Sequence, residues 1–436
     1  MRSIQFRALY RVFLLRIVDF ELLSSDADPV RLIGQFLTIF ATISFFLTIP
    51  ALFALMGGGN LSTTAGWTFE HFLIETAMTV AGIIAILNWD AAFPDRRDAL
   101  VLSPLPVKTS TLFCAKISAF FAAPFLAVLA LSVFTGITWP FIFSPRHSGI
   151  IGLLRSLPAY WLTIFVASAF IVLVVLALQG LAANLLPRQL FLRLSAVFQA
   201  GALCVVLLVY FLGPSLESTA ALTVPQNQRL LAWLPSYWFL GLFQQLNGSM
   251  HPALAPLARQ AWIGVTVSGV GAAVALLLSY FRALPRIVEQ PDILPIMRNL
   301  ACSPRIGNSL QTAISLFTLR TLLRSRQHRT ILSFYLGIGL AIVVACLKSP
   351  LGRAPSPKPG ISAAILFASI LMLVLAILAI RVVAAFPIAL PANWTIRVTQ
   401  MRPARSYQRA VRLAWIVLGI GPVWIVTAAL FFLLYP

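Results

Sequence analysis

Residues 88–116 read NWDAAFPDRRDALVLSPLPVKTSTLFCAK and lie between two apolar segments, each long enough to cross a membrane. Pro94 ends the first of these segments, because proline cannot continue the hydrogen-bond ladder of a helix. Its fixed φ suits the first position of a new helix, and Asp95 places a carboxylate near the positive end of that helix's dipole. The prolines of SPLP at 103–106 end the new helix after about two turns. The stretch therefore predicts a short charged helix at one membrane face, shaped to contact something outside the bilayer.

The composition excludes an ordinary soluble domain. Of the 436 residues, 60% are hydrophobic and 10% are charged, and the mean hydropathy is +0.92. Soluble domains carry roughly 25% charged residues, and a soluble core could not hide so much apolar surface. The bilayer must therefore be the solvent, where helices satisfy their backbone groups within one segment. We expect an all-α integral membrane protein.

Nine segments are apolar over the roughly 20 residues that a membrane-spanning helix needs. They are residues 32–56, 71–89, 112–140, 157–181, 194–213, 261–281, 330–347, 361–386 and 413–435. Residues 1–29 carry apolar side chains at helical spacing with arginines on the other face, which predicts an interfacial amphipathic helix. The predicted fold is a polytopic helical membrane protein with about nine transmembrane helices and interfacial helices.

The formal net charge of +20 is explained by topology. If the N-terminus is cytoplasmic, 25 of the 32 Lys and Arg residues fall on the inner side and 7 on the outer side. This is the positive-inside bias of a multi-pass protein, and basic residues are also attracted to anionic lipids of the inner leaflet. We therefore expect a multi-pass protein of the cell membrane with a cytoplasmic N-terminus, membrane lipids as partners and no nucleic acid.

The sequence carries no catalytic or metal-binding signature. It has no G-x-x-x-x-G-K-[ST] loop for a nucleotide phosphate, no H-E-x-x-H, no C-x-x-C and no G-x-S-x-G. The absence of G-x-S-x-G does not exclude a Ser-His-Asp catalytic site, because such a site can form without that motif. We predict no catalytic residue, no metal ligand and no cofactor bound by this chain. Asp95 and Asp98 could be a carboxylate pair for a metal, but a self-neutralising helix start is the preferred interpretation.

Two ionisable residues lie within predicted spans and are intramembrane candidates, because burial of a charge in a bilayer is costly. Glu75 lies about one turn inside the outer end of its span, and Arg381 lies near the inner end of another. Extension of each side chain to the membrane surface is the preferred interpretation, and a buried ion pair is the alternative.

The longest outer connection, residues 214–260, is rich in aromatic residues. A short helix at 236–246 either dips back into the bilayer or belongs to a surface aromatic belt.

The sequence AAFP occurs at 91–94 and again at 384–387, each time after a span and before a second proline and basic residues. The matching order of elements predicts an internal repeat. It divides the chain into an interfacial helix at 1–29, a six-span module at 30–284, a cytoplasmic linker and basic helix at 285–329, and a partial second module of about three spans at 330–436.

The order of elements resembles the type-two permease subunits of ATP-binding-cassette exporters. The stretch from Trp89 through FPDRRD at 93–98 and LPV at 105–107 to Lys116 is similar to bacterial permeases of that kind, as is SRQHR at 325–329. The resemblance implies that residues 93–108 are a coupling helix seated in a cleft of a separate ATPase. The candidate contacts are Phe93, Pro94, Asp95, Arg96, Arg97, Asp98, Leu105, Pro106 and Lys108.

The resemblance further implies an exporter subunit of the bacterial inner membrane that moves a hydrophobic or amphipathic substrate. ATP would be hydrolysed by the partner, and this chain would not itself be an enzyme. Family modules have six spans, so this chain is expected to be a fused double permease that lacks its last three spans. The resemblance allows two assemblies, a homodimer of this chain and an internal pseudo-dimer formed by its two modules. The alternative functions are a membrane-embedded enzyme that modifies lipids or glycolipids and a non-transporting membrane scaffold.

Overall fold

The structure is a computed structural model in which all described secondary structure is helical. Six of the described helices are long and apolar enough to cross a membrane, and two further apolar helices are shorter. The all-α polytopic fold expected from the sequence is confirmed. The structure describes residues 2–18, 29–56, 63–89, 91–93, 107–144, 149–212, 227–249, 251–280, 326–348, 363–385 and 404–421, with isolated residues between 312 and 317 and between 423 and 428.

The candidate spans agree with eight of the nine predicted segments in position. The six long ones are Ile33–Met56, Gly66–Leu87, Thr109–Ser132, Gly149–Leu185, Pro252–Leu278 and Leu366–Val383, and the two shorter ones are Val197–Phe211 and Ile331–Val344. The ninth predicted segment, 413–435, begins within a described helix and continues beyond the described residues.

The chain forms two compact units, which we describe separately. Unit 1 comprises residues 1–191 and 213–292, and unit 2 comprises residues 192–212 and 293–436. The helices of unit 1 are α1 (Arg2–Val18), α2 (Pro29–Met56), α3 (Thr63–Leu87), α5 (Thr109–Ser132), α6 (Thr135–Phe143), α7 (Gly149–Leu185), α10 (Gln228–Trp233), α11 (Pro235–Asn247), η3 (Pro252–Leu254) and α12 (Ala255–Leu278).

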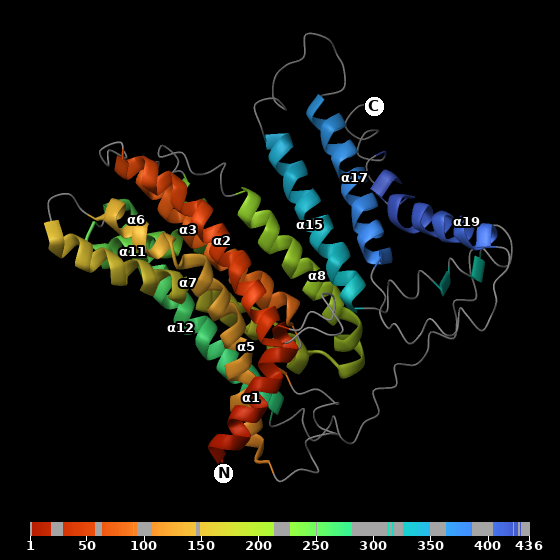
Figure 1. Ribbon diagram of the computed structural model, residues 1–436, viewed down its shortest axis with the longest axis horizontal. Coiled ribbons are helices and arrows are strands. Elements are labelled where there is room, and N and C mark those ends of the chain that lie inside the picture. Colours follow the sequence, from red (N-terminus) through yellow and green to blue (C-terminus); the bar gives the residue numbers. More distant parts are fainter. Residues whose placement is uncertain are drawn as a thin grey trace. The chain divides into compact units, whose positions relative to one another are not determined.

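Unit 1 is a helical bundle in which α11 packs against α3, α7 and α12 (Figure 1). The long helices α7 and α12 run along each other. They approach closely at Gly180, where an added Cβ would collide with the Cβ of Ala275. A glycine is therefore required at this crossing, because any side chain would push the two helices apart.

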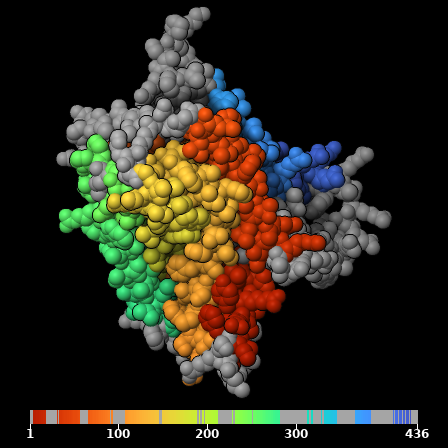
Figure 2. All heavy atoms as spheres, turned by 60° about the vertical axis from the view of Figure 1, so that its left-hand side comes forward, coloured from red at the N-terminus to blue at the C-terminus, as the bar shows by residue number. Residues whose placement is uncertain are grey.

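The N-terminal helix α1 packs along α5, as the space-filling view also shows (Figure 2). Phe13 and Ile17 are buried, and Arg7 and Arg11 are exposed. The apolar side chains of Ile4 and Val12 are also exposed, and an interfacial position for this helix stays a prediction. It ends at Val18, and the rest of the predicted interfacial segment lies outside the described residues.

The predicted span 112–140 is not one helix but two, because a partner on α2 terminates the first. The hydroxyl oxygen of Ser44 accepts hydrogen bonds from the backbone N–H groups of Phe134, at 3.1 Å, and Thr135, at 3.3 Å. These are donors that the start of a helix leaves without an internal partner. The indole N–H of Trp139 also donates to the carbonyl oxygen of Leu47, at 3.2 Å. Contacts with α2 therefore define the break between α5 and α6.

Unit 2 contains most of α8 (Arg188–Leu212) together with α15 (Arg326–Lys348), α17 (Ala363–Ala385), α19 (Ala404–Trp415) and the π-helical turn η6 (Ile416–Ile420). The helices α15 and α17 pack along each other. A Cβ added at Gly337 would lie 2.8 Å from Leu207, so this glycine lets α15 approach α8. Within α19, Arg409 and Arg412 are exposed, whereas Val411 and Leu413 are half-buried.

Candidate functional site

The predicted coupling segment is described only at its two ends. Of the predicted segment 93–108, Phe93, Val107 and Lys108 are described, whereas residues 94–106 lie outside the described residues. That range holds most of the predicted contacts, namely Pro94, Asp95, Arg96, Arg97, Asp98, Leu105 and Pro106. Lys108 is exposed, as a contact residue must be.

The turn at residues 91–93, which follows α3, is held by a buried lysine of α5. Lys116 is 4% exposed, and its Nζ donates a 2.7 Å hydrogen bond to the carbonyl oxygen of Phe93. The same Nζ lies 5.7 Å from the ring centroid of Phe13 on α1, within the range of a cation–π interaction. A buried ammonium group is costly without such partners, so these contacts fix Lys116 and the 91–93 turn together.

A second side chain, from Tyr280 just after the end of α12, holds the same turn. The hydroxyl of Tyr280 donates to the carbonyl oxygen of Ala92, at 3.2 Å, and the Tyr280 ring packs edge-on against Phe113 of α5. The sequence predicts Phe93 as a contact residue, but its ring is buried beside Gly180 of α7. Phe93 therefore anchors the segment to the bundle instead of presenting its ring outward.

A buried polar network surrounds the beginning of α3. Glu70, His71 and Glu75 are 5%, 1% and 5% exposed. The preferred interpretation of Glu75, extension to the membrane surface, is wrong, because its Oε2 lies 3.7 Å from Nδ1 of His71 inside the bundle. That neighbour, one helical turn earlier, draws the carboxylate inward. Arg381, on α17 in unit 2, is exposed, and its extension to a membrane surface stays a prediction.

The network joins α3 to α11. Nε2 of His71 lies 2.9 Å from Oγ of Ser236, and the His71 ring stacks on Tyr237 with centroids 3.8 Å apart. About two turns further along α11, the side-chain amide of Gln244 donates to Oε2 of Glu70. We call these five residues together with Glu75 the α3–α11 network.

The far end of α11 is bound to α6 and α7. Asn247 donates from Nδ2 to the carbonyl oxygen of Phe143, at 2.9 Å, and accepts at Oδ1 from the hydroxyl of Ser156, at 2.6 Å. Nε of Arg155 donates to the carbonyl oxygen of Leu246, at 2.7 Å. The side chain of one asparagine therefore connects three helices.

The burial of α11 bears on one of the two interpretations of residues 236–246, the surface aromatic belt, whereas a re-entrant position in the bilayer stays a prediction. Tyr237, Phe239 and Phe243 are almost completely buried, whereas Trp233, on the preceding α10, is 84% exposed. A surface aromatic belt would leave the rings of α11 exposed, so α11 is an interior helix of the bundle.

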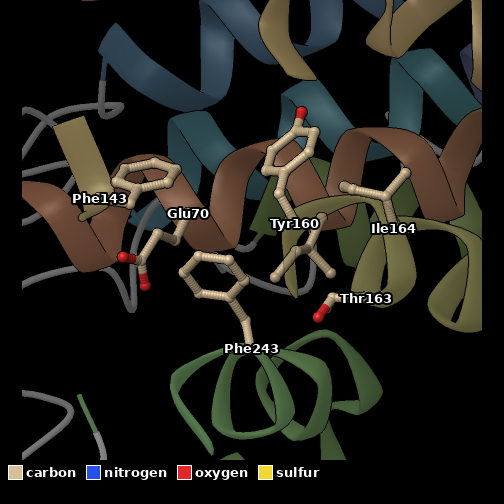
Figure 3. Close-up of a pocket in the computed structure, with 7 residues that line it drawn as sticks. Glu70, Phe143, Tyr160, Thr163, Ile164 and Phe243 are labelled. Atoms are coloured by element: carbon tan, nitrogen blue, oxygen red, sulfur yellow. The ribbon is translucent and has the colours of Figure 1, made fainter. Parts of the chain in front are cut away.

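A small cavity lies beside the network, at the junction of α3, α6, α7 and α11 (Figure 3). Its lining residues are Glu70, Ile74, Phe143, Tyr160, Thr163, Ile164 and Phe243. Its size is of the order of one water molecule. The cavity is lined mainly by apolar surface, and Figure 3 shows the Tyr160 hydroxyl pointing away from Phe243. The cavity is too small for a lipid or a drug-sized ligand.

Sequence reasoning missed most of this network, although one signal was present. Glu70, His71 and Glu75 place three polar groups within two turns of an apolar segment, and only Glu75 was singled out. Nothing local marks Gln244 or Asn247. In the part of the chain that the structure describes, no group of three or more His, Cys, Asp or Glu side chains could hold a metal ion.

Comparisons with known proteins identify no relative: no family model, curated protein or solved structure matches this chain.

Proposed function

We propose that this chain is a membrane-spanning permease subunit, which couples a separate ATP-binding-cassette ATPase to the translocation of a hydrophobic or amphipathic substrate. The observation that carries the proposal is the attachment of the 91–93 turn. Lys116 of α5 and Tyr280, two residues beyond the end of α12, both hold backbone carbonyl groups of this turn, immediately before the segment expected to contact the ATPase. A force applied to that segment would therefore reach two membrane helices directly.

The sequence supplies the rest of the support. The charged segment between Pro94 and Pro106 lies on the basic side of the predicted topology, which is the cytoplasmic side. The chain has no phosphate-binding loop of its own, so a motor would have to be a separate subunit. ATP binding would close two ATPase subunits, displace residues 94–106 and rock the attached helices between inward-open and outward-open states.

Co-purification tests this proposal. A tagged chain, expressed with its neighbouring genes, is expected to retain an ATPase subunit. The double substitution Arg96→Glu with Arg97→Glu is expected to weaken that complex at least tenfold. The matched control is Arg7→Glu with Arg11→Glu, which changes the same number of charges at exposed positions on α1. Equal retention of the ATPase by both variants would contradict the coupling role.

Transport is measured separately from binding. Proteoliposomes that contain the chain and its ATPase would be loaded with fluorescently labelled phosphatidylethanolamine as a model amphipathic substrate. We expect ATP-dependent movement of the label between leaflets, and none with the Arg96→Glu, Arg97→Glu variant. An intact complex without flux of any tested lipid would instead favour the scaffold function.

One observation favours the alternative of a lipid-modifying enzyme. Ser236, His71 and Glu75 have the connectivity of a nucleophile, a base and an orienting carboxylate, with separations of 2.9 Å and 3.7 Å. However, Ser236 is buried and does not line the cavity. A fluorophosphonate probe, which labels activated serines, distinguishes the two functions. Labelling of the wild-type chain that disappears in Ser236→Ala would support the enzyme, and the permease predicts no labelling.

A further inference from the structure

We infer that α19 is an interfacial helix whose arginines bind the headgroups of anionic phospholipids while its apolar face enters the acyl-chain boundary. The inference does not depend on the proposed function. It rests on the distribution of charge along unit 2, on the two faces and the length of α19, and on the apolar segment that follows this helix.

Basic and apolar residues are separated more completely on α19 than on the other described helices of nine residues or more. Arg409 and Arg412 are exposed, together with Gln408. Val411 and Trp415, which lie four residues apart and therefore on the same side of the helix, are half-buried. One strongly basic face and one apolar face are typical of helices that lie in the membrane–water interface.

The arginines of α19 have no acidic partner within their own unit. The sequence contains no aspartate or glutamate after Asp292, and residues 192–212, which complete unit 2, contain none either. Arg409 and Arg412 are joined by Arg405, one turn earlier in the sequence. The counter-charge for this cluster must therefore come from outside unit 2. Phospholipid headgroups provide it, because the guanidinium group matches the geometry of a phosphate.

α19 is too short to cross a bilayer. Its 12 residues extend about 18 Å, whereas the hydrocarbon core is roughly 30 Å thick. A helix of this length is also marginal in water by itself. Among the described elements, α19 has extensive contacts only with η6, which directly continues it. Its apolar face therefore needs another surface for its stability.

The chain around η6 indicates that this surface is the membrane. The predicted span 413–435 begins within the last turn of α19. The π-helical turn η6 contacts α17, which is itself a candidate span, and Figure 1 shows α19 running obliquely to α17 and not alongside it. Trp415 occupies the junction, and tryptophan is enriched where a chain enters a bilayer. Both faces of α19 thus match the boundary that the chain enters next.

Hydrogen–deuterium exchange of the full chain in lipid nanodiscs, with one chain in each disc, tests the inference. Two disc compositions are compared, pure phosphatidylcholine and equal parts of phosphatidylcholine and phosphatidylglycerol. Each basic residue strengthens adsorption to an anionic surface about fivefold, so the α19 amides are expected to exchange at least fivefold more slowly in the anionic discs. Equal exchange in the two compositions would overturn the inference, and this comparison needs no variant.

Two double variants test whether the arginines of α19 carry the effect. Arg409→Gln with Arg412→Gln is expected to remove most of the difference between the two lipid compositions. The matched control is Arg7→Gln with Arg11→Gln, which removes the same number of exposed charges from α1 in unit 1 and is expected to preserve the difference. The α17 amides report whether unit 2 stays folded. Equal effects of the two double variants would overturn the assignment to α19.

Two serine substitutions test the apolar face. Val411→Ser places a hydroxyl on the half-buried side of α19 and is expected to restore fast exchange in the anionic discs. Gln408→Ser introduces the same residue at an exposed position and is expected to leave the slow exchange unchanged. Equally fast exchange in both variants would contradict insertion of this face.

Other occupants of the α19 surface give different results. Slow exchange in discs of either composition would show that another protein surface covers the helix. Slow exchange that appears only in discs loaded with two chains would assign the covering surface to a second copy. Either result would overturn the lipid assignment, whereas loss of the slow exchange at about 1 M salt, where charges are screened beyond about 3 Å, would support it.

Discussion

The ammonium group of Lys116 donates a 2.7 Å hydrogen bond to the carbonyl oxygen of Phe93. These residues are 23 positions apart in sequence, on either side of the charged segment 94–106. The contact joins the turn at residues 91–93, which precedes that segment, to α5, which follows it. Because α3 runs about 25 Å from Glu70 to Leu87, one helix connects this turn with the α3–α11 network near its other end.

Removal of the lysine tests whether this contact stabilises the bundle. Lys116→Met keeps most of the stem and removes the charged donor, which is expected to lower the free energy of unfolding by about 1.5–3 kcal/mol. Lys108→Met is the control, because Lys108 is exposed and its replacement is expected to change stability by less than about 0.5 kcal/mol. Thermal unfolding in detergent measures both. Equal midpoints for the two variants would show that the buried hydrogen bond contributes nothing.

Two adjacent glutamines of α11 test the α3–α11 network. Gln244→Leu leaves the buried carboxyl group of Glu70 without its amide donor, which is expected to cost about 1–3 kcal/mol. Gln245→Leu, one residue further along, changes an exposed side chain and is expected to be nearly neutral. Limited proteolysis between α10 and α12 would report release of α11. Faster cleavage of the Gln245 variant than of the Gln244 variant would contradict this account.

Two glycines are expected to respond to alanine with opposite signs. Gly180→Ala drives a Cβ into Ala275 at the crossing of α7 and α12, so destabilisation by about 1–3 kcal/mol is expected. Gly34→Ala adds a Cβ to α2 where no atom lies within 4 Å. It is expected to stabilise the protein by about 0.5–1 kcal/mol, because alanine loses less backbone entropy in a helix. Thermal midpoints with the same sign of shift would refute the packing argument.

The break between α5 and α6 depends on one hydroxyl group. Ser44→Ala removes the acceptor of two backbone N–H groups and is expected to cost about 1 kcal/mol. Thr42→Ala, on the same helix, removes a hydroxyl that bonds only to its own helix at an exposed position, and a smaller effect is expected. Hydrogen exchange of the Phe134 and Thr135 amides provides a local readout. Unchanged protection in Ser44→Ala would show that these amides have another acceptor.

The helical membrane fold was accessible from the sequence because its signals are local. An apolar run of the right length predicts a span wherever the chain folds. Proline was a poorer guide, because α3 ends at Leu87, before Pro94, and other prolines lie inside helices, namely Pro50, Pro124, Pro140 and Pro158. The same approach misjudged Glu75, whose inward position depends on His71. It also predicted one helix over 112–140. The break in that segment depends on hydrogen bonds to Ser44 of α2, which the local sequence does not indicate.

Sequence alone determined that this chain is an all-α membrane protein with basic residues concentrated on one predicted side. Hydropathy acts within a single segment, so it can be read along the chain. Only the tertiary structure decided which polar groups meet inside the bundle. Glu70 and Gln244 are 174 residues apart, and His71 and Ser236 are 165 apart. Such pairs form because a buried polar group must find a partner in space, and no local pattern specifies which partner that will be.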